Sequence, residues 1–543
     1  MRKREKKCFS SPFYDTERIF RAASPYNNGM RKGIFVSTAI VTGLSVAERA
    51  LGFFYRVALA RMIGAEGLGA YQIALSVFGV FATVGTGGIP VSVSRLISKN
   101  KAEGKEGDGG ALSAGLLLSL CLTAPVLLLF FCSGELFSFL FSGAENLKIF
   151  KILLLGLSFS CLYAVFRGWF WGQKGFFTTS VLEIAEESVM VIVGILLLRR
   201  VPDGFTGAKY AAVAAVVSYL FSFTASAVCF FVKKGKLSSP FPTFKPLAAS
   251  ALPITAVRAG NSLVNSAIAV LMPVMLIRAG MNESEAMQTF GVLSGMVLPV
   301  LFTPSTVIGS LSLVLVPELA EDFYAKRTDR LIKNVERGLT AATLVACVLI
   351  PFFFVLGGDF GLLAYASKQA GETIKTSCPI LLPMSLTMIS TSILNSMGFE
   401  KQTFLFFFIG AAATFLCIFL LPTYLGGYAY VVGLAADFLL CSALNLGFLF
   451  KKLSLKRFSP AFFKRAVTAI FLILPISVFG QFLSAPLHTF FGEFGAIAVL
   501  IVSLSAATAA LYFVCGIIPR KTARNFWKFR RANREKKSVF GKI

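Results

Sequence analysis

Apolar stretches of about 18 to 25 residues recur along the whole chain, and this repetition constrains the fold more than any other feature. One such stretch is long enough for an α-helix to cross the ~30 Å hydrocarbon core of a bilayer. We place fourteen of them, separated by Gly, Pro and clusters of charged residues. They cover residues 34–55, 71–94, 111–132, 149–171, 177–198, 207–232, 247–277, 287–316, 338–356, 376–397, 403–422, 427–450, 466–484 and 494–517.

The composition agrees with a chain whose helices are surrounded by lipid. Hydrophobic residues make up 56% of the 543 residues and charged residues only 15%, whereas soluble proteins carry about 25% charged residues. The sequence therefore predicts an all-α polytopic membrane protein with about fourteen transmembrane helices. Stretches 247–277 and 287–316 are long for a single crossing, so we expect them to be tilted, kinked or partly unwound.

The distribution of positive charge predicts the orientation. The net charge is +26, from 53 Lys and Arg against 27 Asp and Glu. If the N-terminus is cytoplasmic, the two tails and the even-numbered connections hold 40 of those 53 cations. Cytoplasmic loops are enriched in Lys and Arg, so we predict that both termini lie in the cytoplasm.

Domain boundaries follow from the spans. We predict a basic cytoplasmic tail at 1–33, an N-lobe of six spans at 34–232 and a C-lobe of six spans at 246–450, then two additional spans at 466–517 and a second basic tail at 518–543. The basic tails fix topology and attract anionic lipid; docking of nucleic acid or protein is the alternative. A weak internal echo, a basic residue and a Gly-containing turn before each of spans 2 and 8, supports paired lobes around a central cavity.

The first connection also carries a family resemblance. The run Gly52–Tyr71 resembles the first hairpin of polysaccharide flippases of the MOP (multidrug/oligosaccharidyl-lipid/polysaccharide) superfamily. The branch of stage V sporulation protein B fits best, with the lipid II flippase as a cousin, and Gly88–Arg95, Arg167–Gly172 and Phe290–Glu318 fit the same branch. Within the first connection, Arg61, Gly64 and Gly67 are candidate gating and turn residues.

The resemblance implies a MATE-like transporter of two lobes that works by alternating access. Its substrate would be a sugar headgroup on a polyprenyl pyrophosphate, moved from the cytoplasmic to the outer leaflet of the bacterial cytoplasmic membrane for cell-wall, spore-cortex or surface polysaccharide synthesis. Membrane lipids and the enzymes of peptidoglycan or polysaccharide synthesis are candidate partners, and no nucleic acid is expected. At the fifth span the family often shows a Glu-Gln pair followed by an Arg, whereas this chain has Glu186-Glu187 and places Met190 at the Arg position.

Ionisable side chains inside the spans are costly and are candidates for function. Arg49 and Arg56 are seven residues apart, which places them on nearly the same helical face. Two guanidinium groups in this array suit a pyrophosphate. Arg258 takes the equivalent place in the second lobe, beside Asn261 and Asn265. We predict that these residues bind the substrate headgroup; the alternative is that Arg49 pairs with a carboxylate and Arg56 reaches to an interface.

Carboxylates in the spans are candidates for ion coupling. Glu183, Glu186 and Glu187 share one face of the fifth span, and three ionised groups this close would repel, so at least one is expected to be protonated. Asp437 in span 12 is a second candidate. Coupling to Na⁺ or H⁺ would follow, with no other cofactor. Alternatively the glutamates face water or pair with Arg167 or Lys174, and Asp437 is structural.

Three other classes of function are the alternatives: an antiporter, an enzyme, and a non-transporting scaffold in an envelope-assembly complex, which the sequence leaves open. A cation-coupled drug or metabolite antiporter of the MATE type is the alternative function, although several Arg on paired lobes favour an anionic substrate. An enzyme is not expected, because the longest connection is about 20 residues and His488 is the single histidine. Cysteines lie scattered without a CxxC pair, so no metal site is expected, and the absence of a GxxxxGK[ST] loop excludes transport driven by ATP in this chain.

Overall fold

The structure, a computed structural model, describes residues 28–104, 108–132, 141, 144–199 and 204–517, and these residues form helices without any strand. The helices are α2 (Asn28–Thr86), α3 (Ile89–Ala102), α4 (Asp108–Cys132), α5 (Ala144–Leu155), α6 (Leu157–Gly172), α7 (Phe176–Leu198), α8 (Gly204–Val232), α9 (Phe241–Arg278), α10 (Glu283–Gly291), the π-helix η2 (Val292–Val297), α11 (Leu298–Leu301), α12 (Thr303–Tyr324), α13 (Thr328–Tyr365), α14 (Lys368–Ser377), η3 (Cys378–Ile380), α15 (Leu381–Ser396), α16 (Glu400–Leu420), α17 (Pro422–Leu425), α18 (Tyr428–Leu453), η4 (Leu455–Arg457) and α19 (Pro460–Val514).

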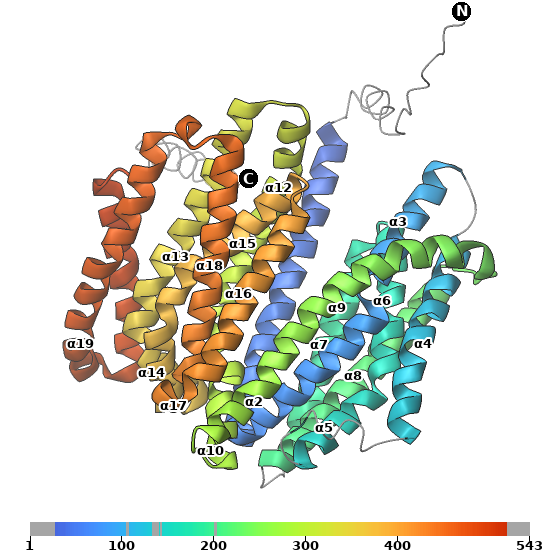
Figure 1. Cartoon of the computed structure of the whole chain (residues 1–543), viewed down its shortest axis with the longest axis horizontal. Helices are drawn as coiled ribbons and strands as arrows, with labels where there is room; N and C mark the ends of the chain where they lie inside the picture. The colour runs from blue at the N-terminus through green and yellow to red at the C-terminus, as the bar shows by residue number, and fades with distance from the viewer. Residues whose placement is uncertain (1–27, 105–107, 133–140, 142–143, 200–203, 518–543) are drawn as a thin grey trace, which may run out of the picture.

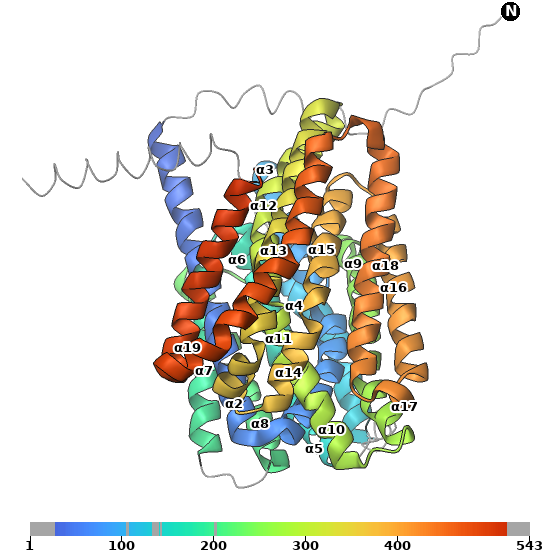
Figure 2. The same ribbon diagram turned by 90° about the vertical axis from the view of Figure 1, so that its left-hand side faces the viewer.

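The helices form two groups that meet at one end (Figure 1). Helices α3 to α8 make the first group, and α12, α13, α15, α16 and α18 make the second, with α19 on its outer side (Figures 1 and 2). Long α2 and α9 run between the groups. The first half of α9 packs on α3 and α4, because Ser92 donates to Ser250 at 3.1 Å and Thr243 donates to the Gly110 carbonyl at 2.8 Å. Arg258 is thereby held against the first group.

The prediction of a polytopic all-α membrane protein is confirmed. Among the described residues, nine helices are long and apolar enough to cross a membrane, or up to eleven if each of two bent pairs is one span. Two helical stretches hold two predicted spans each: residues 43–101, which take in most of α2 and of α3, and α19, which is 55 residues long. At 1.5 Å per residue, each is far longer than one crossing requires. The count of fourteen spans stays a prediction.

The first predicted hairpin is one helix with a break at Gly64. Gly64 has φ 69° and ψ 179°, a conformation that L side chains rarely adopt. Beyond the break, α2 packs closely on α10 and η2. A Cβ added at Gly291 would collide with the Ala65 carbonyl, so the two backbones meet where there is no side chain. The structure thus places Gly64 and Gly67 where the two groups of helices join.

A distortion of the kind predicted for the two long spans is present in the second of them. Residues 283–312 contain a π-helical segment and a bend of 45° near Phe302. Helix α9 is continuous over 38 residues but carries internal Pro246, Pro253 and Pro273, each of which removes a backbone hydrogen bond. Helix α2 also begins at Asn28, before the predicted start of the first span, while the rest of the predicted tails, 1–27 and 518–543, lies outside the described residues.

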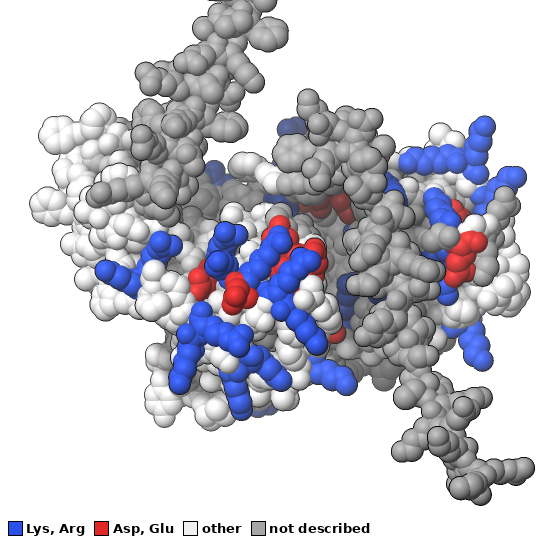
Figure 3. Space-filling view, turned by 90° about the horizontal axis from the view of Figure 1, so that it is seen from above, with Lys and Arg blue, Asp and Glu red and all other residues white. Residues whose placement is uncertain are grey.

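Both described ends of the chain lie at the same end of the molecule, the upper end of Figure 2. Lys and Arg side chains gather on this face, with a few Asp and Glu between them (Figure 3). The basic turns that follow α3, α8, α12 and α18 supply them. This placement agrees with a cytoplasmic N-terminus and a cytoplasmic C-terminus.

Candidate functional site

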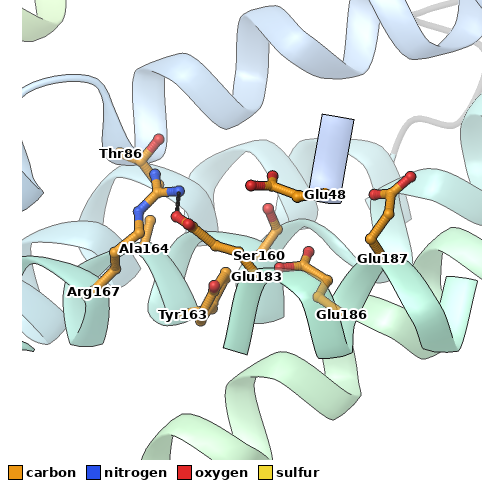
Figure 4. A pocket seen from close by; sticks show the side chains of 9 residues that line it. All are labelled: Glu48, Thr86, Ser160, Tyr163, Ala164, Arg167, Glu183, Glu186 and Glu187. Atoms are coloured by element: carbon orange, nitrogen blue, oxygen red, sulfur yellow. Dashed lines mark hydrogen bonds and ion pairs between the residues drawn. The ribbon is translucent and has the colours of Figure 1, made fainter. Parts of the chain in front are cut away.

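A polar cavity of about 280 Å³ lies between α2, α6 and α7. We call it the carboxylate cavity, because four glutamates line it: Glu48 from α2 and Glu183, Glu186 and Glu187 from α7 (Figure 4). The predicted clustering on α7 is therefore present, and Glu48 joins it from another helix. Among the described residues, no group of His, Cys, Asp or Glu has an arrangement that could hold a metal ion.

Arg167 is the cation of this cavity. Its Nη1 lies 3.2 Å from Glu183 Oε1, and the two side chains are 32% and 21% exposed (Figure 4). The guanidinium also lies over the rings of Tyr163 and Trp171, at 5.9 and 5.2 Å. The sequence analysis named Arg167 only as a possible ion-pair partner of the glutamates. The structure shows this ion pair with Glu183.

A second cavity of about 250 Å³ adjoins the first and shares Arg167 and Thr86 with it. We call it the Arg258 cavity; Thr83, Gly87, Pro90, Arg258 and Asn261 complete its lining. Arg258 Nη1 donates to the Gly87 carbonyl at 2.7 Å, so α9 presents its guanidinium at the break between α2 and α3. Two guanidinium groups from distant parts of the chain thus line one cavity.

Two polar atoms at this cavity have no protein partner within the described structure. They are the buried Nε of Arg167 and the buried Oδ1 of Asn261. Buried polar groups are nearly always hydrogen-bonded. An N–H donor and an amide acceptor left open beside two cations can serve a polar, anionic ligand.

The other predicted headgroup residues lie outside both cavities. Arg49 is exposed and its Nη1 donates to Thr306 Oγ1 of α12 at 3.1 Å, which links the two groups of helices. Arg56 is exposed and lies within electrostatic reach of Glu187. Asn265 is exposed on α9 and lines neither cavity. Since α2 turns Glu48 toward α7, it turns Arg49 away from it.

The candidate gating residues lie at the lower junction of the two groups. Arg61 Nε donates to the Ala364 carbonyl at 2.8 Å, and its Nη2 donates to the Leu363 carbonyl. These carbonyls belong to the last turn of α13, where the helix dipole favours a cation. Gly67 packs on the backbone of Gly204. The role of these residues in gating stays a prediction.

Asp437, the second coupling candidate, lies far from the glutamates in the second group of helices. It faces Gly410 of α16, and Cys441 Sγ donates to its Oδ1 at 3.1 Å. Among the described residues this thiol is the one side-chain hydrogen bond given to Asp437. Within the part of the chain that the structure describes, no cation forms an ion pair with Asp437.

Thr83, Thr86 and Arg167 are among the cavity residues to which the sequence analysis assigned no binding role. Arg167 belongs to the Arg167–Gly172 run that carried the family resemblance, which was the available signal. Thr83 and Thr86 gave no signal in the sequence. Each makes a hydrogen bond to the carbonyl four residues earlier, as any Thr in a helix can.

Residues 34–322 match the family described as polysaccharide biosynthesis protein, which is more than half of the chain. The chain belongs to this family. The resemblance of this chain to a polysaccharide biosynthesis family, predicted from the motifs, is thereby confirmed, and the chain is a multi-pass protein of the bacterial cytoplasmic membrane.

Known proteins extend the likeness beyond residue 322. The chain is 26% identical over 414 residues to stage V sporulation protein B of Bacillus subtilis (strain 168), covering 73% of this chain and 79% of that protein. Its fold is similar to the lipid II flippase MurJ in an inward closed conformation, with a TM-score of 0.67 and 15% identity over 88% of this chain and 99% of that one. An inward-facing multidrug resistance MATE family transporter of the MOP superfamily gives 0.61 and 15%, over 75% and 95%.

Proposed function

We propose that this protein moves a lipid-linked oligosaccharide or peptidoglycan precursor, a sugar on polyprenyl pyrophosphate, from the cytoplasmic to the outer leaflet by alternating access. The observation that carries the proposal is the Arg258 cavity, where Arg167 and Arg258 converge from helices 91 positions apart in the chain. Guanidinium groups bind phosphate bidentately. The open N–H of Arg167 and the open amide oxygen of Asn261 add a donor and an acceptor for a sugar.

Each of the two arginines is held in place by a protein partner. Glu183 holds Arg167 from one side, which fixes the guanidinium and leaves its other N–H groups toward the Arg258 cavity. Arg258 is fixed by the Gly87 carbonyl. Because these cations are already ordered, binding an anion costs little further side-chain entropy.

A MATE-like cation-coupled antiporter is the second candidate function, and the carboxylate cavity favours it. Four glutamates and one arginine give that cavity a surplus of carboxylates, which suits H⁺ or a cationic drug. The two functions are compatible with one fold, since both a lipid II flippase and a MATE transporter share it.

The test is to identify lipid retained by the purified protein using native mass spectrometry. Wild type, Arg258→Ala, Arg49→Ala/Arg56→Ala and the surface control Lys401→Ala are compared. A polyprenyl-pyrophosphate sugar that is retained by wild type and Lys401→Ala but lost from Arg258→Ala would support the proposal. Bulk phospholipid alone in every sample, together with cation efflux driven by an ion gradient, would favour the antiporter instead.

A further inference from the structure

A third charged cavity lies where α13 and α19 begin, at the end of the molecule that carries the basic turns. It has a volume of about 400 Å³ and contains Lys333 and Arg337 of α13 and Arg465 of α19. We call it the basic cavity. It shares no residue with the carboxylate cavity or the Arg258 cavity, and the proposed transport of a glycan makes no use of it.

The single carboxylate of the basic cavity is already engaged. Glu336 Oε1 accepts a hydrogen bond from the backbone N–H of Ser459 at 2.5 Å, at the start of α19. No ion pair joins Glu336 to Lys333, Arg337 or Arg465 within the described structure. Three cations therefore face one carboxylate that is held by a helix N-terminus, and the cavity keeps a surplus of positive charge.

Arg337 is held in place rather than free to move with solvent. Its Nη1 donates to Asn334 Oδ1 at 3.2 Å, and the buried Asn334 in turn donates to the buried Asp322 at 2.9 Å. This chain fixes one side of the guanidinium. Its remaining N–H groups have no partner in the described structure, and they lie on the cavity.

The depth of these cations matches the level of lipid phosphates. Arg337 is followed by an uncharged run over residues 338–358, which spans about 30 Å as a helix, the thickness of the hydrocarbon core. Arg465 likewise precedes an uncharged run over residues 466–487 of α19. The buried Phe462 lies one turn before Arg465, toward the start of α19. Below Arg337 the cavity continues past Ala341 and Leu344 of α13. Its lining thus changes from cationic to apolar in the direction in which a lipid changes from headgroup to acyl chain.

We propose that the basic cavity binds the headgroup of an anionic phospholipid, with the phosphate between Arg337 and Arg465 and the start of an acyl chain against Leu344. Basic pockets between transmembrane helices on the cytoplasmic side bind anionic lipid headgroups in this way. A site of this kind ties α19 to the body of the transporter through a lipid of the surrounding membrane. It acts independently of the substrate.

The test uses the full-length protein, purified in detergent and stripped of lipid. Short-chain phosphatidylglycerol is titrated against wild type, Arg337→Gln/Arg465→Gln, and the control Lys234→Gln/Lys236→Gln. The control removes two exposed cations from the same end of the molecule without touching the cavity. Loss of two cations should weaken binding roughly 30-fold, while the control stays within about twofold and phosphatidylcholine binding is unchanged.

Two further variants separate a built site from diffuse attraction. Thr340→Trp fills the cavity and keeps every charge, so it should lose phosphatidylglycerol as Arg337→Gln/Arg465→Gln does, whereas Thr340→Ala should bind like wild type and melt like it. Equal weakening in the lysine control, or normal binding by Thr340→Trp, would overturn the proposal. So would glycerol phosphate binding as tightly as the lipid, since the acyl contact would then contribute nothing.

Discussion

The carboxylate cavity and the basic cavity both place charge among membrane-spanning helices, with opposite balances. The first holds four glutamates and one arginine, and its arginine is paired with Glu183. The second holds three cations and one glutamate, and its glutamate is paired with a helix N-terminus. In each cavity the minority charge has a protein partner, and most of the majority charges have no ion pair within the described residues.

The charged residues of the two cavities also differ in their depth along the helices. The glutamates of α7 lie in the middle of a 23-residue helix, whereas Arg337 and Arg465 lie at the border of uncharged runs. An ionisable group far from water is expensive and implies a function in transport, while a cation at the headgroup level is inexpensive and implies contact with lipid.

The largest effect on transport is expected from Arg258, which lines the Arg258 cavity. Arg258→Ala should lower transport of a lipid-linked glycan in proteoliposomes by roughly 30-fold or more, because it removes a positioned charge that meets an anionic headgroup. Arg258→Lys should restore part of the rate, since an ammonium group lacks the planar fork. Lys401→Ala is the matched loss of one exposed cation and should transport normally; an Arg258→Ala rate close to wild type would remove the cavity from the mechanism.

The next effect separates the two coupling candidates. Glu186 has no hydrogen bond or ion pair within the described residues, in contrast to Glu183. Glu186→Gln should therefore remove most of the dependence of transport on a proton or sodium gradient, while Asp437→Asn should keep it. The measurement is the transport rate with and without each gradient. The reverse result would move coupling to the second group of helices.

A smaller effect concerns stability. Arg167→Leu leaves Glu183 unpaired beside three other glutamates and should lower the free energy of unfolding by about 1–2 kcal/mol, as expected for an ion pair that is partly exposed. Arg167→Leu/Glu183→Gln should recover more than half of that loss. Thermal unfolding of the two single variants and the double variant gives the coupling energy. Additive losses would show that the pair contributes nothing beyond its separate side chains.

The smallest effect is expected at Arg61, whose charge is paired with backbone carbonyls instead of a carboxylate. Arg61→Ala should weaken the contact between α2 and the end of α13 by about 0.5–1 kcal/mol. The thiol of an added Ala65→Cys substitution, in the cavity beside Arg61, should then be labelled roughly two to five times faster. Arg61→Lys keeps the charge and should show about half of the increase; equal labelling of all three proteins would contradict a gating contact.

The charged residues show where prediction from sequence ended. The spacing of Glu183, Glu186 and Glu187 placed them correctly on one face, because a single helix fixes its own periodicity. The spacing of Arg49 and Arg56 was equally regular, yet α2 directs Arg49 to Thr306 and neither residue to the two cavities. Arg258 and Asn261 do line a cavity, together with Arg167, which the sequence could not pair with them across 91 positions.

The sequence by itself determined that the chain is a helical membrane protein, because the length and apolarity of each stretch suffice to partition a helix into a bilayer. The tertiary structure decided which charges share a cavity. That depends on the rotation and crossing of helices, which are set by close backbone approaches such as Ala65 with Gly291 and by breaks such as Gly64. Apolar patterning cannot specify these contacts, because lipid and a neighbouring helix are equally apolar surroundings.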